Sequence, residues 1–169
     1  MRATLPSARA AIAALLLAGS AGAQAQVDAE TLKAAFVYNF ALYATWPAPV
    51  RDTGEITVCV PARSTLAPAL GELAGKPVDA RRLAVRSVEA YAPGDGCDVR
   101  VVDATAASPP AERGVLTICD CSESPAPSGD IIALVREGTR LRFDVDLAAA
   151  DAARITLSSK LLHLARTTR

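Results

Sequence analysis

The strongest hydrophobic pattern of the chain lies in residues 27–47, where large apolar side chains recur every three to four positions. This spacing predicts a long amphipathic helix. Asp28 is a suitable N-cap, and the helix is expected to end at Trp46 because a residue before proline avoids the helical conformation. Five of the seven aromatic residues lie here: Phe36, Tyr38, Phe40, Tyr43 and Trp46. The helix should therefore supply a large part of the core.

Short runs rich in β-branched residues follow, and each is bounded by turn residues. These runs predict strands at 55–60, 83–88, 98–102 and 114–119. Between them, leucines at helical spacing predict a helix over 64–73, and one helical turn is expected within 104–111. Strands that alternate with helical connectors indicate an α/β domain with a largely parallel sheet.

The pattern changes near the end of the chain. Residues 131–136 and 140–145 flank Glu137-Gly138, which predicts an antiparallel hairpin. Along 140–145, apolar residues alternate with charged ones, so one face of the hairpin should pack on the core and the other should face water or a partner. A closing helix is expected over 156–165. The predicted fold is thus a single α/β domain with helices flanking the sheet.

The N-terminus has the pattern of a secretory leader. Arg2 and Arg9 precede a short apolar run, and small residues end in Ala23-Gln24-Ala25. This arrangement predicts a signal peptide over 1–25, cleaved after Ala25, followed by one domain over 26–169. The apolar run is shorter than the roughly 18 to 20 residues of a membrane-spanning helix, so the mature protein is expected to be exported and not membrane-embedded.

Charge gives little support for a polyanionic partner. The chain has 18 basic and 18 acidic residues, and loss of the two leader arginines leaves a net charge of about −2. This balance argues against a nucleic-acid surface and against an anionic membrane surface.

Four cysteines in an exported chain are expected to form disulfides. Three pairings are possible, and we favour Cys59 with Cys97 and Cys119 with Cys121. On the chain-entropy account the longer loop contributes about 4 kcal/mol and the three-residue loop about 1.5 kcal/mol. In adjacent parallel strands, Cys59 and Cys97 would lie roughly 10 Å apart, beyond the reach of a disulfide. This pairing therefore predicts a shifted register or a different strand order.

Candidate chemistry is sparse, and we assign no catalytic residue, metal site or cofactor. His163 is the single histidine, and Ser158 with Lys160 lies outside any nucleophile motif. No phosphate-binding glycine loop is found. Cys119-Asp120-Cys121 is the one stretch with conceivable redox reactivity, although a structural bridge is favoured. Four acids near turns are expected to be solvated: Asp95, Asp98, Asp144 and Asp146.

Several segments together resemble the YfiR-like periplasmic family. The most specific are LKAAFVYNFALYATWP at 32–47 and ITLSSKLLHLA at 155–165. Weaker support comes from ITVCV at 56–60, Cys97-Asp98, GVLTI at 114–118 and LRFDVD at 141–146. The family's disulfides fall on Cys59 and Cys97 and, less closely, on Cys119 and Cys121.

The resemblance implies a non-catalytic periplasmic repressor. Such a protein binds the periplasmic sensor domain of an inner-membrane diguanylate cyclase and thereby lowers cyclic di-GMP signalling. In the best-known systems of the family, an outer-membrane lipoprotein with a peptidoglycan-binding domain sequesters the repressor. No nucleic-acid partner is expected, and a homodimer is left open.

Four residues are expected to contact the partner. Tyr43 and Trp46 lie at the end of the first helix, and Arg140 and Arg142 lie on the charged hairpin face. Aromatic and arginine side chains supply much of the binding energy at protein interfaces.

Two alternative functions remain: a periplasmic small-molecule binder whose ligand lies beside the sheet, and a thiol-disulfide protein that uses Cys119 and Cys121.

Overall fold

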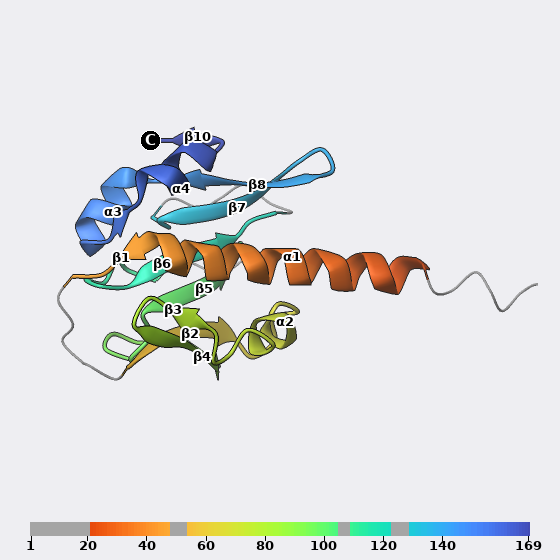
Figure 1. The fold of residues 1–169 in the computed structure, drawn as a ribbon, viewed down its shortest axis with the longest axis horizontal. Helices are drawn as coiled ribbons and strands as arrows, with labels where there is room; N and C mark the ends of the chain where they lie inside the picture. The colour runs from red at the N-terminus through yellow and green to blue at the C-terminus, as the bar shows by residue number, and fades with distance from the viewer. Residues whose placement is uncertain (1–20, 48–53, 105–108, 123–128) are drawn as a thin grey trace, which may run out of the picture.

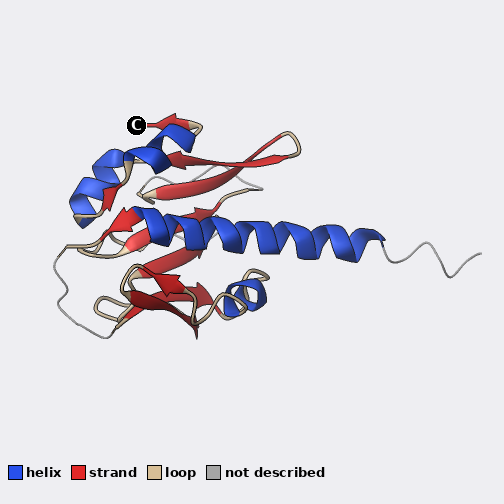
Figure 2. Cartoon of the chain, viewed as in Figure 1, coloured by secondary structure: helices blue, strands red, loops and turns tan. Residues whose placement is uncertain are grey.

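The computed structural model describes residues 21–47, 54–104, 109–122 and 129–169, with side chains from residue 29 onward. In these ranges a large sheet carries four helices (Figures 1 and 2). Five strands at its centre are parallel, and a hairpin near the C-terminus is antiparallel. The predicted α/β fold class is confirmed. Most of the predicted leader, residues 1–20, lies outside the described residues.

Among the described residues, the eight strands of the large sheet have the order β10-β8-β7-β6-β5-β2-β4-β3. The parallel strands are β2 (Glu55–Pro61), β4 (Arg81–Val88), β5 (Val99–Asp103), β6 (Leu116–Asp120) and β7 (Ile132–Glu137). The antiparallel partner of β7 is β8 (Arg140–Val145). Two short strands close the edges: β3 (Pro77–Val78) and β10 (Thr167–Thr168).

The chain reverses its direction across the sheet at β2. From β2 it moves outward to β4, then returns past β2 to β5 and continues the other way through β6 and β7. Because crossovers between parallel strands are right-handed, the two directions place their connections on opposite faces. The first crossover, which contains α2 (Ala67–Gly71), lies beside α1 (Ala21–Tyr43). The connection 89–98, from β4 to β5, therefore runs over the other face.

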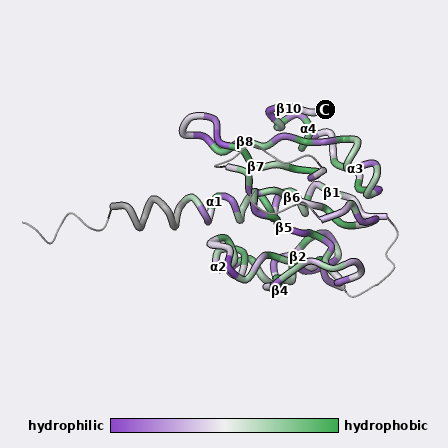
Figure 3. Tube along the Cα trace, turned by 180° about the vertical axis from the view of Figure 1, so that it is seen from behind, coloured by the Kyte–Doolittle hydropathy of each residue, from purple (hydrophilic) through white to green (hydrophobic). Residues whose placement is uncertain are grey.

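Helix α1 covers one face of the sheet (Figure 1). Its buried side includes Val37 and Phe40, which pack in one core cluster with aliphatic residues of the central strands. Phe143 of the hairpin meets Phe36 and Phe40 with ring centroids 6.0 and 5.0 Å apart. Hydropathy follows this packing: the central strands are mainly hydrophobic, whereas the turn of the β7-β8 hairpin is hydrophilic (Figure 3). Among the described residues, no helix combines the length and apolarity needed to cross a membrane.

Both ends of the first helix differ from the prediction. It begins at Ala21, upstream of Asp28, because the alanine-rich residues 21–25 favour the helical conformation. It ends at Tyr43, because the next two residues form β1 (Ala44–Thr45) and pair with β9 (Thr156–Leu157).

The same pairing shortens the predicted closing helix. Helix α4 (Ser159–Leu164) starts after β9, and its N-cap is Ser158, whose hydroxyl accepts a hydrogen bond from the Leu161 amide. Helix α3 (Leu147–Ala153) is absent from the sequence interpretation, and α2 is shorter than predicted. The hairpin turn is Gly138-Thr139 rather than Glu137-Gly138, since Glu137 pairs with Arg140. The predicted helical turn within 104–111 lies partly outside the described residues.

Candidate functional site

The face of the sheet opposite α1 carries a row of polar side chains. Side chains alternate along a strand, so Val99 and Val101 face α1 while Arg100 faces the other way. In register with one another across β4, β2 and β5 lie Arg86, Cys59 and Arg100. The connection 89–98 runs over this face, which places Tyr91 against Val102 and Cys119 in a second, smaller apolar cluster.

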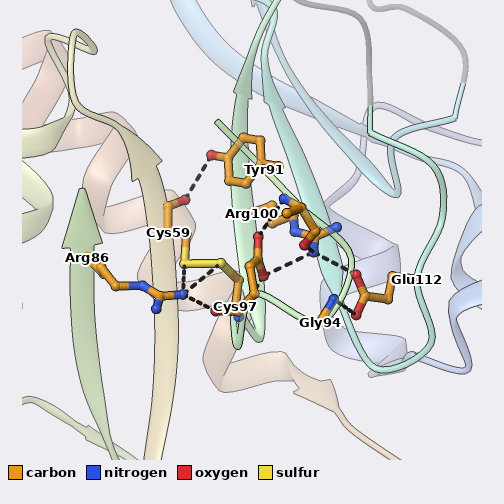
Figure 4. A network of polar contacts seen from close by, with 9 residues as sticks. Cys59, Arg86, Tyr91, Gly94, Cys97, Arg100 and Glu112 are labelled. Atoms are coloured by element: carbon orange, nitrogen blue, oxygen red, sulfur yellow. Dashed lines mark hydrogen bonds and ion pairs between the residues drawn. A yellow bond between two sulfur atoms is a disulfide. The ribbon is translucent and has the colours of Figure 1, made fainter. Parts of the chain in front are cut away.

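Arg100 is the centre of the polar network on this face. It is 2 % exposed, although it is flanked by valines in a buried strand. One guanidinium nitrogen lies 3.0 Å from Asp95, 2.6 Å from Glu112 and 2.9 Å from the Ala92 carbonyl (Figure 4). Two carboxylates and a carbonyl therefore compensate the buried charge and hold two loops to the sheet.

These contacts shift the pKa values of the network in opposite directions. Burial acts to lower the pKa of Arg100, but hydrogen bonds and charges from Asp95 and Glu112 outweigh it, so the pKa is raised. For Asp95, partial burial acts to raise the pKa, but hydrogen bonds from Arg100 and from two backbone amides outweigh it, so the pKa is lowered. Both groups are thus charged in the folded protein.

The same loop reaches the disulfide between Cys59 and Cys97. A guanidinium nitrogen of Arg86 lies 3.2 and 3.3 Å from the two sulfur atoms and 2.6 Å from the Asp95 carbonyl (Figure 4). The Tyr91 hydroxyl is within hydrogen-bonding distance of the Cys59 carbonyl, at 3.2 Å, and of the Val101 carbonyl. Burial, followed by the charge of Asp103, raises the pKa of Tyr91. The network therefore links β2, β4 and β5 through one loop.

The bridge forms without the register shift that the sequence appeared to require. Strands β2 and β5 are adjacent, and Cys59 pairs with Arg100, three residues after Cys97. Even so, the Cα atoms of the two cysteines are 5.7 Å apart. Cys97 precedes β5 and follows Gly96, whose φ of 84° turns the chain across the face instead of extending the strand. The expectation of a shifted register was therefore wrong.

Cys119 and Cys121 are joined on the same face, because residues two apart in a strand project to one side. They are 0 and 2 % exposed. Asp120 between them projects to the α1 side, where it accepts a hydrogen bond of 2.9 Å from Lys33. Reactive cysteines are usually accessible, so this burial favours a structural bridge over thiol exchange.

A groove lies at the carboxyl ends of β2, β4 and β5. Its volume is about 300 Å³, and its lining includes Pro61, Arg63, Val88, Tyr91 and Asp103. A smaller hollow of about 120 Å³ contains Arg100 and Glu112 and shares Tyr91, Pro109 and Pro110 with the groove. Tyr91 thus belongs both to the charged network and to the lining of the groove.

The four predicted contact residues do not form one patch. Tyr43, which is 37 % exposed, and Trp46 lie at the C-terminal end of α1. Trp46 is partly buried, and its indole N–H donates to the Asp98 carbonyl at 3.3 Å, at the amino end of β5. Arg140 and Arg142 lie near the hairpin turn, at the carboxyl end of β7. The two pairs are therefore at opposite ends of the sheet.

Sequence reasoning missed the residues that organise the polar face: Tyr91, Arg86, Arg100, Asp95 and Glu112. One signal was present, since Arg100 interrupts an otherwise apolar strand that is buried on both faces, and a charge at such a position needs a partner.

His163 lies in α4, and the described residues contain no group of three or more potential ligands among His, Cys, Asp and Glu that could hold a metal ion.

The profile of the family described as YfiR/HmsC-like matches residues 30–166. No curated protein matches the chain. The matched range includes both disulfides, the Arg100 network, the groove and the hairpin, so each of these features lies within the family domain.

Proposed function

The chain belongs to the YfiR/HmsC-like family, and on this premise we propose that it is a periplasmic repressor of an inner-membrane diguanylate cyclase. In this proposal it binds the sensor domain of the cyclase without catalysing a reaction. The observation that carries the proposal is the family match over most of the chain. An outer-membrane lipoprotein that binds peptidoglycan would sequester the repressor and relieve the inhibition.

Two features of the chain support a periplasmic location. Its first 25 residues have the pattern of a cleavable leader, and its four cysteines form two disulfides. Disulfides persist in the oxidising periplasm and are rare in the reducing cytosol.

The polar network supports a binding role rather than catalysis. Arg100, Asp95 and Glu112 use their charges on one another, and the Arg86 guanidinium lies against the sulfurs of a disulfide. These contacts hold the loops of the domain in place. A rigid surface loses little conformational entropy on binding, which favours affinity for a partner.

Repression across the membrane requires that the protein distinguish two states of the sensor domain. It can shift their balance only by its difference in affinity for them, and each tenfold difference corresponds to about 1.4 kcal/mol. We propose that the hairpin arginines Arg140 and Arg142 and the aromatic end at Tyr43 supply this contact. Their separation makes them two surfaces that can be tested one at a time.

The test is complementation of a strain that lacks the gene, with cyclic di-GMP as the readout. An Arg140→Glu, Arg142→Glu variant should lose repression and raise cyclic di-GMP, while an Arg113→Glu variant, which reverses an exposed arginine elsewhere, should repress normally. Tyr43→Ala tests the second surface. Trp46→Ala is less informative because Trp46 is partly buried and hydrogen-bonded. Full repression by both the hairpin variant and Tyr43→Ala would contradict the proposed contacts.

A further inference from the structure

The groove between β2 and β5 lies where the chain reverses its direction across the sheet. Numbered in chain order, the five parallel strands have the order 2-1-3-4-5, and the reversal falls between the first and third, which are β2 and β5. In open α/β sheets, ligands bind outside the carboxyl ends of the strands at such a point. Here Pro61 ends β2 and Asp103 ends β5; both line the groove.

The walls of the groove are largely rigid and apolar. Pro61, Pro109 and Pro110 have fixed φ angles, and Tyr91 is held by the backbone carbonyls of Cys59 and Val101. Preformed walls reduce the conformational entropy lost on binding. The volume of about 300 Å³ lies at the lower end of the range for small-molecule sites.

The charges at the groove favour a cation. Asp103 and Glu89 line it together with a single base, Arg63. The Arg63–Asp103 pair is loose, with 3.9 Å between Nε and Oδ2, and the Arg63 side chain is 74 % exposed while that of Asp103 is 29 % exposed. An exposed pair of this kind contributes at most about 1 kcal/mol, so another cation can compete for Asp103.

The adjoining Arg100 network adds no net positive charge that would repel a cation. The two guanidinium groups of Arg86 and Arg100 are balanced there by two carboxylates, Asp95 and Glu112. The lining of the groove and the smaller hollow contains three carboxylates and two guanidinium groups: Glu89, Asp103 and Glu112 with Arg63 and Arg100. Tyr91, which is common to both, already has the Arg100 guanidinium 5.6 Å from its ring centroid, and its ring can pack against a flat apolar group.

We propose that this groove binds a small organic amine with a flat apolar body. The ammonium group lies against Asp103 and Glu89, and the apolar body packs on Tyr91, Pro109 and Pro110. This inference goes beyond the proposed function and does not depend on it, because a binding measurement on the isolated protein involves neither the cyclase nor repression.

The test compares two probes that share a phenyl ring but differ in charge, phenethylamine and 3-phenylpropionate. Each is titrated into the mature, oxidised protein, and amide chemical shifts are followed by NMR. We expect saturable shifts around Tyr91 and Asp103 with phenethylamine, at least tenfold weaker binding of 3-phenylpropionate, and weaker binding of the amine at high salt.

Variants locate the site. Asp103→Asn should weaken amine binding about tenfold, and Glu89→Gln should weaken it less, whereas Asp151→Asn on α3 is the matched control and should bind as the parent does. Glu89 is exposed, so its variant tests the site even if the Asp103 variant is unstable. Equal or tighter binding of 3-phenylpropionate, shifts that map elsewhere, or no saturable response to the amine would overturn the proposal.

Discussion

Arg100 interrupts a buried strand with a charge, and its partners come from two loops that are close to it in sequence and meet at its guanidinium group. Asp95 lies five residues before it and Glu112 twelve residues after it. Both carboxylates are less buried than the guanidinium, at 14 and 31 % exposed against 2 %. The arginine is therefore the group whose removal disturbs the network most.

Replacement of Arg100 by leucine should lower the free energy of unfolding by about 2 to 3 kcal/mol. Loss of one partner of a fully buried ion pair costs roughly 3 to 5 kcal/mol, and the partial exposure of the two carboxylates reduces this figure. Urea denaturation followed by the fluorescence of the single tryptophan, Trp46, measures the change. Arg113→Leu, at an exposed position, should stay within about 0.5 kcal/mol of the parent. An equal change in the free energy of unfolding for Arg100→Leu and Arg113→Leu would show that the Arg100 network adds no stability.

The lowered pKa of Asp95 predicts that the stability of the protein depends on pH. Its pKa is lower in the folded protein than the ordinary value of 3.8, so the unfolded chain binds more protons in acid. The stability from this group is fully present above about pH 5 and is lost as the pH falls below about 4 towards the folded pKa. Asp146 acts in the same direction, because the Ala149 amide and Arg169 lower its pKa.

The measurement is the free energy of unfolding between about pH 6 and pH 3. The parent should lose stability in acid, and Asp95→Asn should show a flatter profile over the same range, while Asp151→Asn should follow the parent. A profile of Asp95→Asn that runs parallel to that of the parent would show that Asp95 does not contribute.

The acids show where sequence reasoning fails at the scale of single residues. All four that were expected to be solvated have fixed partners: Asp95 binds Arg100, Asp98 accepts from the Thr57 amide, Asp144 binds Arg166, and Asp146 caps α3. The partners of Asp98 and Asp144 lie 41 and 22 residues away in sequence. Only the fold brings them together, so no local pattern could have revealed them.

At the scale of elements, the prediction succeeded where the hydrophobic pattern alone decides the structure. The longer strands and the hairpin were found within two residues at each end, because their β-branched runs and alternation reflect burial. The two-residue strands β1 and β9 were missed because their pairing is tertiary and leaves no period in the sequence. Helix α3 was missed because its run of alanines lacks large apolar residues at helical spacing.

The packing of α1 on the hairpin yields a prediction at this scale. Phe143 is 3 % exposed and contacts both Phe36 and Phe40. Phe143→Ala should lower the free energy of unfolding by about 3 to 5 kcal/mol, because it leaves a cavity between helix and hairpin. Tyr43→Ala, at the more exposed end of the same helix, should cost about 1 kcal/mol or less. If urea denaturation gives a similar small loss for both, the aromatic cluster does not hold the hairpin to α1.

At the scale of the whole molecule, the two faces of the sheet are stabilised by different means. One face is covered by α1 and α2 and holds the main apolar cluster. The other carries a small apolar cluster, two disulfides and the Arg100 network. Among the described residues, covalent and ionic links therefore add to the small apolar cluster in holding the loops to that face. Right-handed crossovers decide on which face each connection lies, but they fix neither the order of the strands nor the identity of the polar contacts.

The two disulfides should therefore differ in what they contribute. The Cys59–Cys97 bridge spans 38 residues and joins β2 to the start of β5 at the point where the chain reverses across the sheet. Its removal in a Cys59→Ser, Cys97→Ser variant should lower the free energy of unfolding by about 4 kcal/mol. The Cys119–Cys121 bridge spans two residues, and a Cys119→Ser, Cys121→Ser variant should lose about 1.5 kcal/mol or less.

Denaturation of both variants in urea, with the parent measured with and without a reductant, separates the two contributions. Full reduction of the parent should reproduce the sum of the two losses, because the bridges lie in different loops and should act independently. The Cys119→Ser, Cys121→Ser variant should also repress the cyclase normally if the function proposed above is correct, since its fold is kept. A larger loss from the short bridge than from the long one would mean that local packing around Cys119, rather than the constraint on the unfolded chain, decides the stability of this face.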